Sequence, residues 1–221
     1  TNTNVGNPDA DSNKDQNEKA WNGDAEGEGS VTVVVGDDGN YKVIVNKDVN
    51  KSVEVPDTWG GVTVDLNGNT IKGNDADGNN EAKPGLDFTH DNNAQIDPKP
   101  GTNLTIIGNG TIKGGSGSTD NPKGAPGIKG ETGAEKAEIT VKSPAQVIGG
   151  NGATGTDGNG GNGGAGIDGA ITPTIDGATV SGGNGGSGGE SANGDGGNGG
   201  KGGDGINTPG KNPTVENGGK V

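Results

Sequence analysis

A long internal repeat constrains the fold of this chain more than any other feature. A threonine flanked by apolar residues or proline recurs at spacings of 42, 35, 34 and 40 residues, as Thr63, Thr105, Thr140, Thr174 and Thr214. After each of the first four comes a second short β-type segment that ends in glycine, and then a polar, glycine-rich stretch that closes on glycine and an aliphatic residue. Ordered repeats of this length are typical of solenoids, in which each unit buries its apolar side against the next.

The segments within each repeat are short and bounded by Gly, Asn and Asp, which favours strands over helices. The run Val64-Asp65-Leu66-Asn67-Gly68-Asn69-Thr70-Ile71-Lys72-Gly73 resembles the coil signature of right-handed parallel β-helix proteins of pectate-lyase-like architecture. Residues 106–114 are a looser copy. The resemblance implies an all-β, right-handed parallel β-helix solenoid, but not a function, because that fold hosts lyases, adhesins and fibres alike. A local hairpin at Asn67-Gly68 is the alternative.

Two regions are expected along the chain. Residues 1–30 are polar, acidic and without a period, and are expected to form a flexible leader. Residues 31–221 are expected to form the β-helix, with glycine-rich insertions at about 73–85, 114–133, 149–166 and 182–205. The chain begins at Thr1 without a signal peptide, which suggests a processed or excised fragment.

The insertions have a period of three. Residues 182–190 form three Gly-Gly-X triplets, residues 191–195 break the phase, and residues 196–204 resume it. This is the period of the polyproline II conformation, and glycine fits where such chains crowd together. Each insertion is therefore predicted to be an out-and-back pair of polyglycine II helices stacked on its neighbours, with any polar residue tolerated at X. The X residues here are Asn184, Ser187, Glu190, Asn198, Lys201 and Asp204.

The insertions are similar in motif to the polyglycine-helix bundles of some phage tail-tip adhesins and of a small arthropod antifreeze protein. A flexible glycine linker is the alternative interpretation. Linkers rarely keep a triplet phase across a break, which favours the packed interpretation.

Composition excludes some classes of partner. The net charge is −14, arginine is absent and only 24% of the residues are apolar. Such a chain has no basic patch for nucleic acid or anionic membranes, and no apolar run long enough for a transmembrane helix. The same composition is also typical of disorder, so that the repeat alone argues for a folded chain.

No catalytic set or cofactor is expected. The β-helix lyases use a basic residue, often arginine, beside a calcium site, and the related hydrolases use clustered aspartates with a Gly-His-Gly segment. This chain has neither arginine nor that segment, and its single histidine, His90, lies in a polar stretch. Residues 163–171 nearly match a nonapeptide calcium repeat but lack tandem copies, which leaves Asp168 as a weak calcium candidate and predicts no bound metal.

The phase breaks are the candidate binding positions, because polar loops on a regular scaffold tend to carry binding residues. The candidates are Ser118, Thr119, Asp120, Asn121, Thr156, Asp157, Ser191 and Asn193. The alternative is that these tips only turn the chain.

The sequence thus predicts a non-catalytic, extracellular structural or adhesive surface protein with a glycan or protein as partner. A self-assembling fibre or matrix subunit is the main alternative. An ice-binding protein and a polysaccharide-active enzyme are less favoured.

Overall fold

The computed structural model describes residues 29–36, 39–55, 61–88, 103–130, 137–156, 158–191 and 194–221. Within these residues the protein is all-β and contains no helix. Of the predicted leader only Gly29 and Ser30 are among them, and His90, Asp157 and Asn193 lie outside the described residues.

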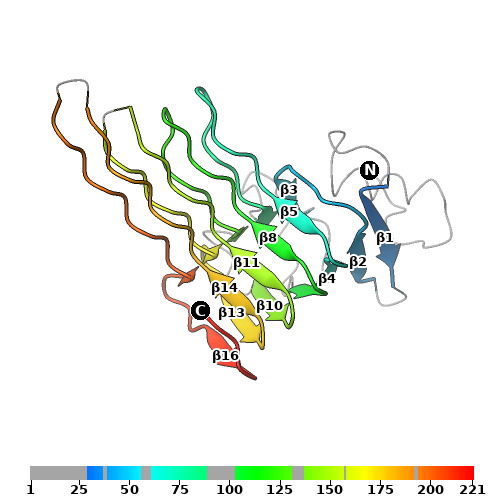
Figure 1. Ribbon diagram of the computed structural model, residues 1–221. Helices are drawn as coiled ribbons and strands as arrows, with labels where there is room; N and C mark the ends of the chain where they lie inside the picture. Colours follow the sequence, from blue (N-terminus) through cyan, green and yellow to red (C-terminus); the bar gives the residue numbers. More distant parts are fainter. Residues whose placement is uncertain are drawn as a thin grey trace, which may run out of the picture.

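The described strands form three sheets (Figure 1). Sheet A contains β1 (Val31–Val35), β2 (Tyr41–Val45), β4 (Gly61–Asp65), β7 (Asn103–Ile107), β10 (Glu138–Lys142), β13 (Thr172–Asp176) and β16 (Thr214–Glu216). Sheet B contains β5 (Thr70–Lys72), β8 (Thr111–Lys113), β11 (Gln146–Ile148) and β14 (Thr179–Ser181). Sheet C contains β3 (Val53–Glu54), β6 (Leu86–Phe88), β9 (Ile128–Gly130), β12 (Ile167–Asp168) and β15 (Ile206–Asn207).

The chain visits sheets A, B and C in the same order in each repeat. We number the repeats by their strands: β4–β6 form repeat 1, β7–β9 repeat 2, β10–β12 repeat 3 and β13–β15 repeat 4. Strands of successive repeats pair in parallel, and among the described strand pairs only β1–β2 is antiparallel. The pairing aligns the five repeated threonines in register, which confirms the repeat read from the sequence.

The Asn-Gly step makes a corner between two sheets. Asn67 and Gly68 have φ values of 48° and 84°, in the left-handed region where Asn and Gly are the favoured residues. The chain then enters β5, which pairs with β8 and not with β4. The local hairpin alternative is therefore wrong, since the two strands that flank the turn belong to different sheets.

The core consists of apolar columns that run through the stacked repeats. In sheet A one column is completely buried over four successive strands, at Val64, Ile106, Val141 and Ile175. Strand β1 covers the first end of the stack, with Val31, Val33 and Val35 buried. At the other end the columns finish in Val215 and Val221, which are 48% and 60% exposed.

Between sheets B and C the chain leaves the strands and returns, and these excursions lie side by side (Figure 1). We call residues 73–77, 114–118, 149–153 and 182–190 the outgoing legs, and residues 81–84, 122–127, 160–166 and 196–205 the returning legs. The second insertion ends at Gly127, earlier than residue 133. Ile128 begins β9 because it pairs with Leu86 and Ile167 in the buried column of sheet C.

Candidate binding surface

Backbone hydrogen bonds link every leg of repeats 2–4 to its neighbours. The first glycine of a triplet donates its N–H to the X carbonyl of the next repeat: Gly152 to Asn184 at 2.8 Å and Gly163 to Lys201 at 2.9 Å. The second glycine donates between outgoing and returning legs, as Gly183 does to the carbonyl of Gly164 at 2.8 Å. The legs are thus held laterally rather than along their own length.

The X residues of the fourth insertion have exposed side chains, as predicted. At the equivalent positions of the third insertion, asparagines accept hydrogen bonds from backbone N–H groups of the next repeat. Asn151 Oδ1 accepts the N–H of Asn184 at 3.0 Å, and Asn162 Oδ1 accepts the N–H of Lys201 at 3.0 Å. In the third insertion a short side chain with an amide oxygen thus reaches the next leg. The expectation that the X positions of the fourth insertion tolerate any polar residue stays a prediction.

This gives a first prediction. Asn162→Ala should lower the free energy of unfolding by about 1 kcal/mol, because the N–H of Lys201 loses its acceptor. Asn198→Ala is the matched control, since Asn198 is an X residue of the last leg and no side-chain hydrogen bond of it is seen among the described residues. Urea denaturation of both variants checks the difference; equal losses would contradict it.

The tips of the insertions form one bonded row. Asn121 Nδ2 donates to the carbonyl of Asp77 at 2.8 Å, which ties the second tip to the first. The N–H of Thr156 donates to the carbonyl of Thr119 at 3.0 Å, and the N–H of Gly189 to the carbonyl of Gly158 at 2.8 Å. These bonds extend the row through the third insertion to the fourth.

The predicted tip residues divide into two groups. Thr119, Asp120 and Thr156 are exposed, so their side chains face solvent along the row. Ser118, Asn121 and Ser191 are half-buried and act in the turns. Ser118 Oγ accepts the N–H of Asn121 at 3.3 Å, and the N–H of Ser191 donates to the carbonyl of Asp195 at 2.9 Å.

Two aspartates of the first insertion are held ionised by hydrogen bonds. The N–H of Asn79 and then the side chain and N–H of Asn80 donate to Asp77 Oδ1 and lower the pKa of that carboxyl. Partial burial alone would raise the pKa of Asp75, but the hydrogen bonds from Lys72 Nζ and the N–H of Ser116 outweigh it, and the net pKa is lowered.

The sign of this effect sets a pH prediction. A folded-state pKa below the unfolded value means that both carboxylates stabilise the fold above the ordinary value of 3.8. That stabilisation should disappear as the pH falls through the lower folded-state values. Melting temperatures measured from pH 6 down to pH 2 should decline, and the double variant Asp75→Asn/Asp77→Asn should decline less steeply. An unchanged slope would contradict the assignment.

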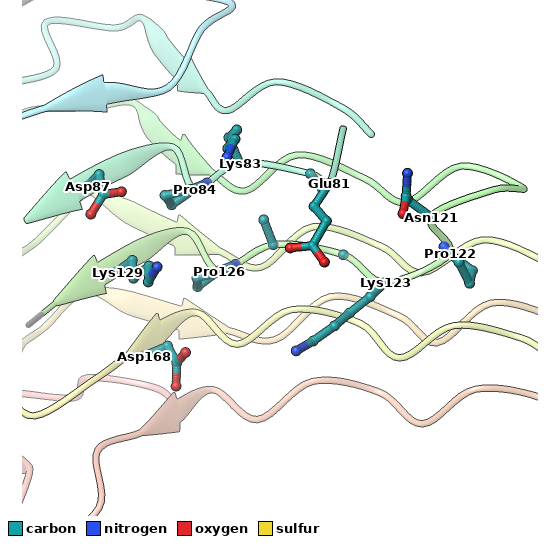
Figure 2. A pocket seen from close by; sticks show the side chains of 13 residues that line it. Glu81, Lys83, Pro84, Asp87, Asn121, Pro122, Lys123, Pro126, Lys129 and Asp168 are labelled. Atoms are coloured by element: carbon teal, nitrogen blue, oxygen red, sulfur yellow. The ribbon is translucent and has the colours of Figure 1, made fainter. Parts of the chain in front are cut away.

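A polar groove lies beside the tips and was not foreseen from the sequence. It has a volume of about 380 Å³ and is lined by the first two returning legs and by sheet C. Figure 2 shows Glu81 and Lys123 at its leg side and a column of strand side chains, Asp87, Lys129 and Asp168, at the other. These three are neighbours in strand register. In the sequence, the only sign of the groove is the charged residue that follows each of the first three Gly-aliphatic pairs, namely Asp87, Lys129 and Asp168.

The groove offers both donors and acceptors. Lysine ammonium groups alternate with carboxylates, and Pro84, Pro122 and Pro126 add apolar ring surface. Such a lining suits a ligand that is rich in hydroxyls or carries both charges.

Asp168, the calcium candidate, belongs to this lining. Its Oδ1 accepts the amide of Asn207 at 2.7 Å. In the part of the chain that the structure describes, no group of three or more His, Asp or Glu side chains is arranged to hold a metal ion.

The repeated threonines point away from the core. Thr63, Thr105, Thr140 and Thr174 are half-buried, and each lies between two buried residues of its strand. The threonine row therefore lies on the outer face of sheet A. The columns beside it contain charged residues such as Glu138, Lys142 and Asp176, so the threonines form a single row and not a uniform plane.

None of the described residues belongs to a helix long and apolar enough to cross a membrane. Comparison with known proteins found no family model that matches the chain, no similar protein among curated sequences and no similar solved structure.

Proposed function

We propose that this chain is a right-handed parallel β-helix solenoid whose polyglycine II insertions display a row of polar tips, and that it acts as a non-catalytic, extracellular structural or adhesive surface protein. The constant A, B, C order of the strands supports a solenoid. Right-handed winding is supported by the general rule that parallel crossover connections are right-handed in about 98% of cases. The period-three bonding of the legs supports polyglycine II packing.

One observation carries the functional proposal: the tips are bonded to one another and, through the legs, to the stacked strands. Glycine is the residue that loses most conformational freedom on folding, and each fixed residue costs about 1–2 kcal/mol. Such an ordering is expensive for a segment that only connects two strands. The ordering of these insertions is explained if their function requires the tips to stay in fixed positions.

The row and the adjoining groove together support a polar partner. Exposed hydroxyls and carboxylates at Thr119, Asp120 and Thr156 adjoin a groove with both charges, and the row contains little aromatic surface. This chemistry fits a polar partner, a surface glycan or protein, bound at several weak points along the row.

The test is adhesion without loss of fold. Beads coated with the chain are applied to immobilised glycans and to cultured cells. The triple variant Thr119→Ala/Asp120→Ala/Thr156→Ala should reduce retention about ten-fold, with an unchanged melting temperature, because surface changes typically alter stability by less than about 0.5 kcal/mol. Ser187→Ala/Lys201→Ala, on exposed leg positions, is the control. Retention of the triple variant equal to that of the parent would mean that the tips only turn the chain.

A second candidate, the self-assembling fibre subunit, is favoured by the end of the stack at β16, which lies opposite β1 (Figure 1). There Val215 and Val221, at the end of the apolar columns, are 48% and 60% exposed. Electron microscopy of the purified chain separates the two, since a fibre subunit should form filaments.

A further inference from the structure

Among the described residues, the last pair of legs has an edge of backbone donors without a backbone acceptor. In repeat 3, Gly149, Gly160 and Gly163 donate their N–H groups to the carbonyls of Ser181, Asn198 and Lys201 of repeat 4, at 2.9, 2.7 and 2.9 Å. The equivalent donors of repeat 4 have no backbone acceptor among the described residues; they are the N–H groups of Gly182, Gly185, Gly188, Gly199 and Gly202. Along each leg these donors recur about every 9 Å, at every third residue.

Two of the five edge glycines, Gly199 and Gly202, are not required by any contact in the described part of the chain. At the other three a Cβ would overlap a carbonyl of the returning leg of the same insertion. A Cβ on Gly160 or Gly163 would overlap a backbone carbonyl of the next outgoing leg. At the equivalent Gly199 and Gly202 the nearest atom lies at 3.7 Å, an ordinary contact, and neither residue has a left-handed φ. Since glycine costs folding entropy wherever another residue fits, its retention indicates that the space is used.

The opposite end of the bundle shows what an uncovered leg pair looks like. The first insertion, residues 73–85, keeps glycine only at Gly73, Gly78 and Gly85 and carries side chains elsewhere. The last leg pair instead retains full Gly-Gly-X triplets, and it lies at the end of the stack where Val215 and Val221 are exposed.

We propose that the edge of the last leg pair is a docking surface for a further extended Gly-Gly-X segment that presents a backbone carbonyl at every third residue. Each earlier repeat already receives such a segment at the same place, through the bonds from repeat 3 to repeat 4. The inference rests on the polyglycine packing proposed above.

A second copy of this chain fits the edge poorly. The same edge of a second copy also presents N–H groups, so that donors would face donors. Stacking β16 of one copy on β1 of the next places residues 41–55, which carry no glycine-rich insertion, between the two bundles. The acceptor edge must therefore come from a different glycine-rich segment.

The test uses the full chain labelled for amide hydrogen exchange and, as the probe, a synthetic peptide with the sequence of residues 182–205. At about 1 mM peptide, the exchange of the five donors should slow about ten-fold, while amides inside the bundle keep their rates. A peptide of the same composition with the triplet phase scrambled should give no protection. Absence of protection by the phased peptide would overturn the proposal.

Two substitutions sharpen the test. Gly202→Val should leave the melting temperature unchanged and abolish the protection, because its side chain occupies the docking space. Lys201→Ser, at an exposed position, should preserve both. If the phased peptide protects the donor amides of Gly202→Val as well as those of the parent, the proposal is wrong. It is also wrong if the protection of these amides rises with the concentration of the chain alone, since the occupant would then be a second copy.

A third variant separates this proposal from the packing on which it rests. A Cβ on Gly203 would overlap the carbonyl of Gly164 in the preceding repeat, so Gly203→Val should be strongly destabilising. If Gly203→Val is as silent as Gly202→Val, the packing itself is wrong. If it is destabilising and the phased peptide still fails to protect the edge, only the docking proposal fails.

Discussion

Gly200→Val should destabilise the protein by several kcal/mol, whereas Gly199→Val, one residue away, should be nearly silent. A Cβ on Gly200 would overlap the carbonyl of Gly161, so the last returning leg must move away from repeat 3. That movement breaks the bonds from the N–H groups of Gly160 and Gly163 to the carbonyls of Asn198 and Lys201, at 2.7 and 2.9 Å. Each buried group left unpaired costs about 1–3 kcal/mol. At Gly199 the nearest atom to the added Cβ is 3.7 Å away.

Thermal melting of the two variants measures the effect. At roughly 2–4 °C per kcal/mol for a chain of this size, a loss of about 3 kcal/mol lowers the melting temperature by about 6–12 °C. Lys201→Ser, at an exposed position, is an additional control. A flexible linker predicts no loss from either valine and even a slight gain, because replacing glycine reduces the entropy of the unfolded chain. Equal melting of the two valine variants would therefore refute the packed bundle.

Ile106→Ala should cost about 2–5 kcal/mol, because it opens a cavity in the middle of a buried column. Ile106 is fully buried and lies in register between Val64 and Val141. Val215→Ala, in the same column but 48% exposed, should cost less than about 0.5 kcal/mol. Denaturant unfolding of both variants provides the measurement. Similar losses at the two positions would show that the exposed end of the column is covered in solution.

The strand order could be predicted from the sequence because each strand repeats one local pattern. Thr63 and Thr105 are recognisable as equivalents, and a parallel stack is the simplest way to bury the apolar residues beside them. The out-and-back course of the insertions was predictable for the same reason, since a triplet that resumes after a break shows its own period. In both cases the information lies within one repeat.

Features that depend on which repeats meet could not be predicted in this way. The acceptor role of Asn162 requires knowing that Lys201 lies beside it, across 39 residues of sequence. The end of the second insertion was misplaced for a similar reason. Gly130 continues a glycine triplet in the sequence, but it belongs to β9, because Ile128 must pair in sheet C. The groove also escaped notice, since its wall combines residues of three repeats.

The direction of the hydrogen bonds between the legs has a mechanical consequence. The bonds lie across the legs, whereas a pull on a tip acts along them. Such a load strains the lateral bonds of a leg together, in shear, and does not open them one after another from the end. Both legs of an insertion continue into strands of the stacked sheets, so the load passes from the tip into several repeats at once. A tip held in this way resists extraction by the cooperative strength of the whole stack, although each contact between the legs is only a single backbone hydrogen bond.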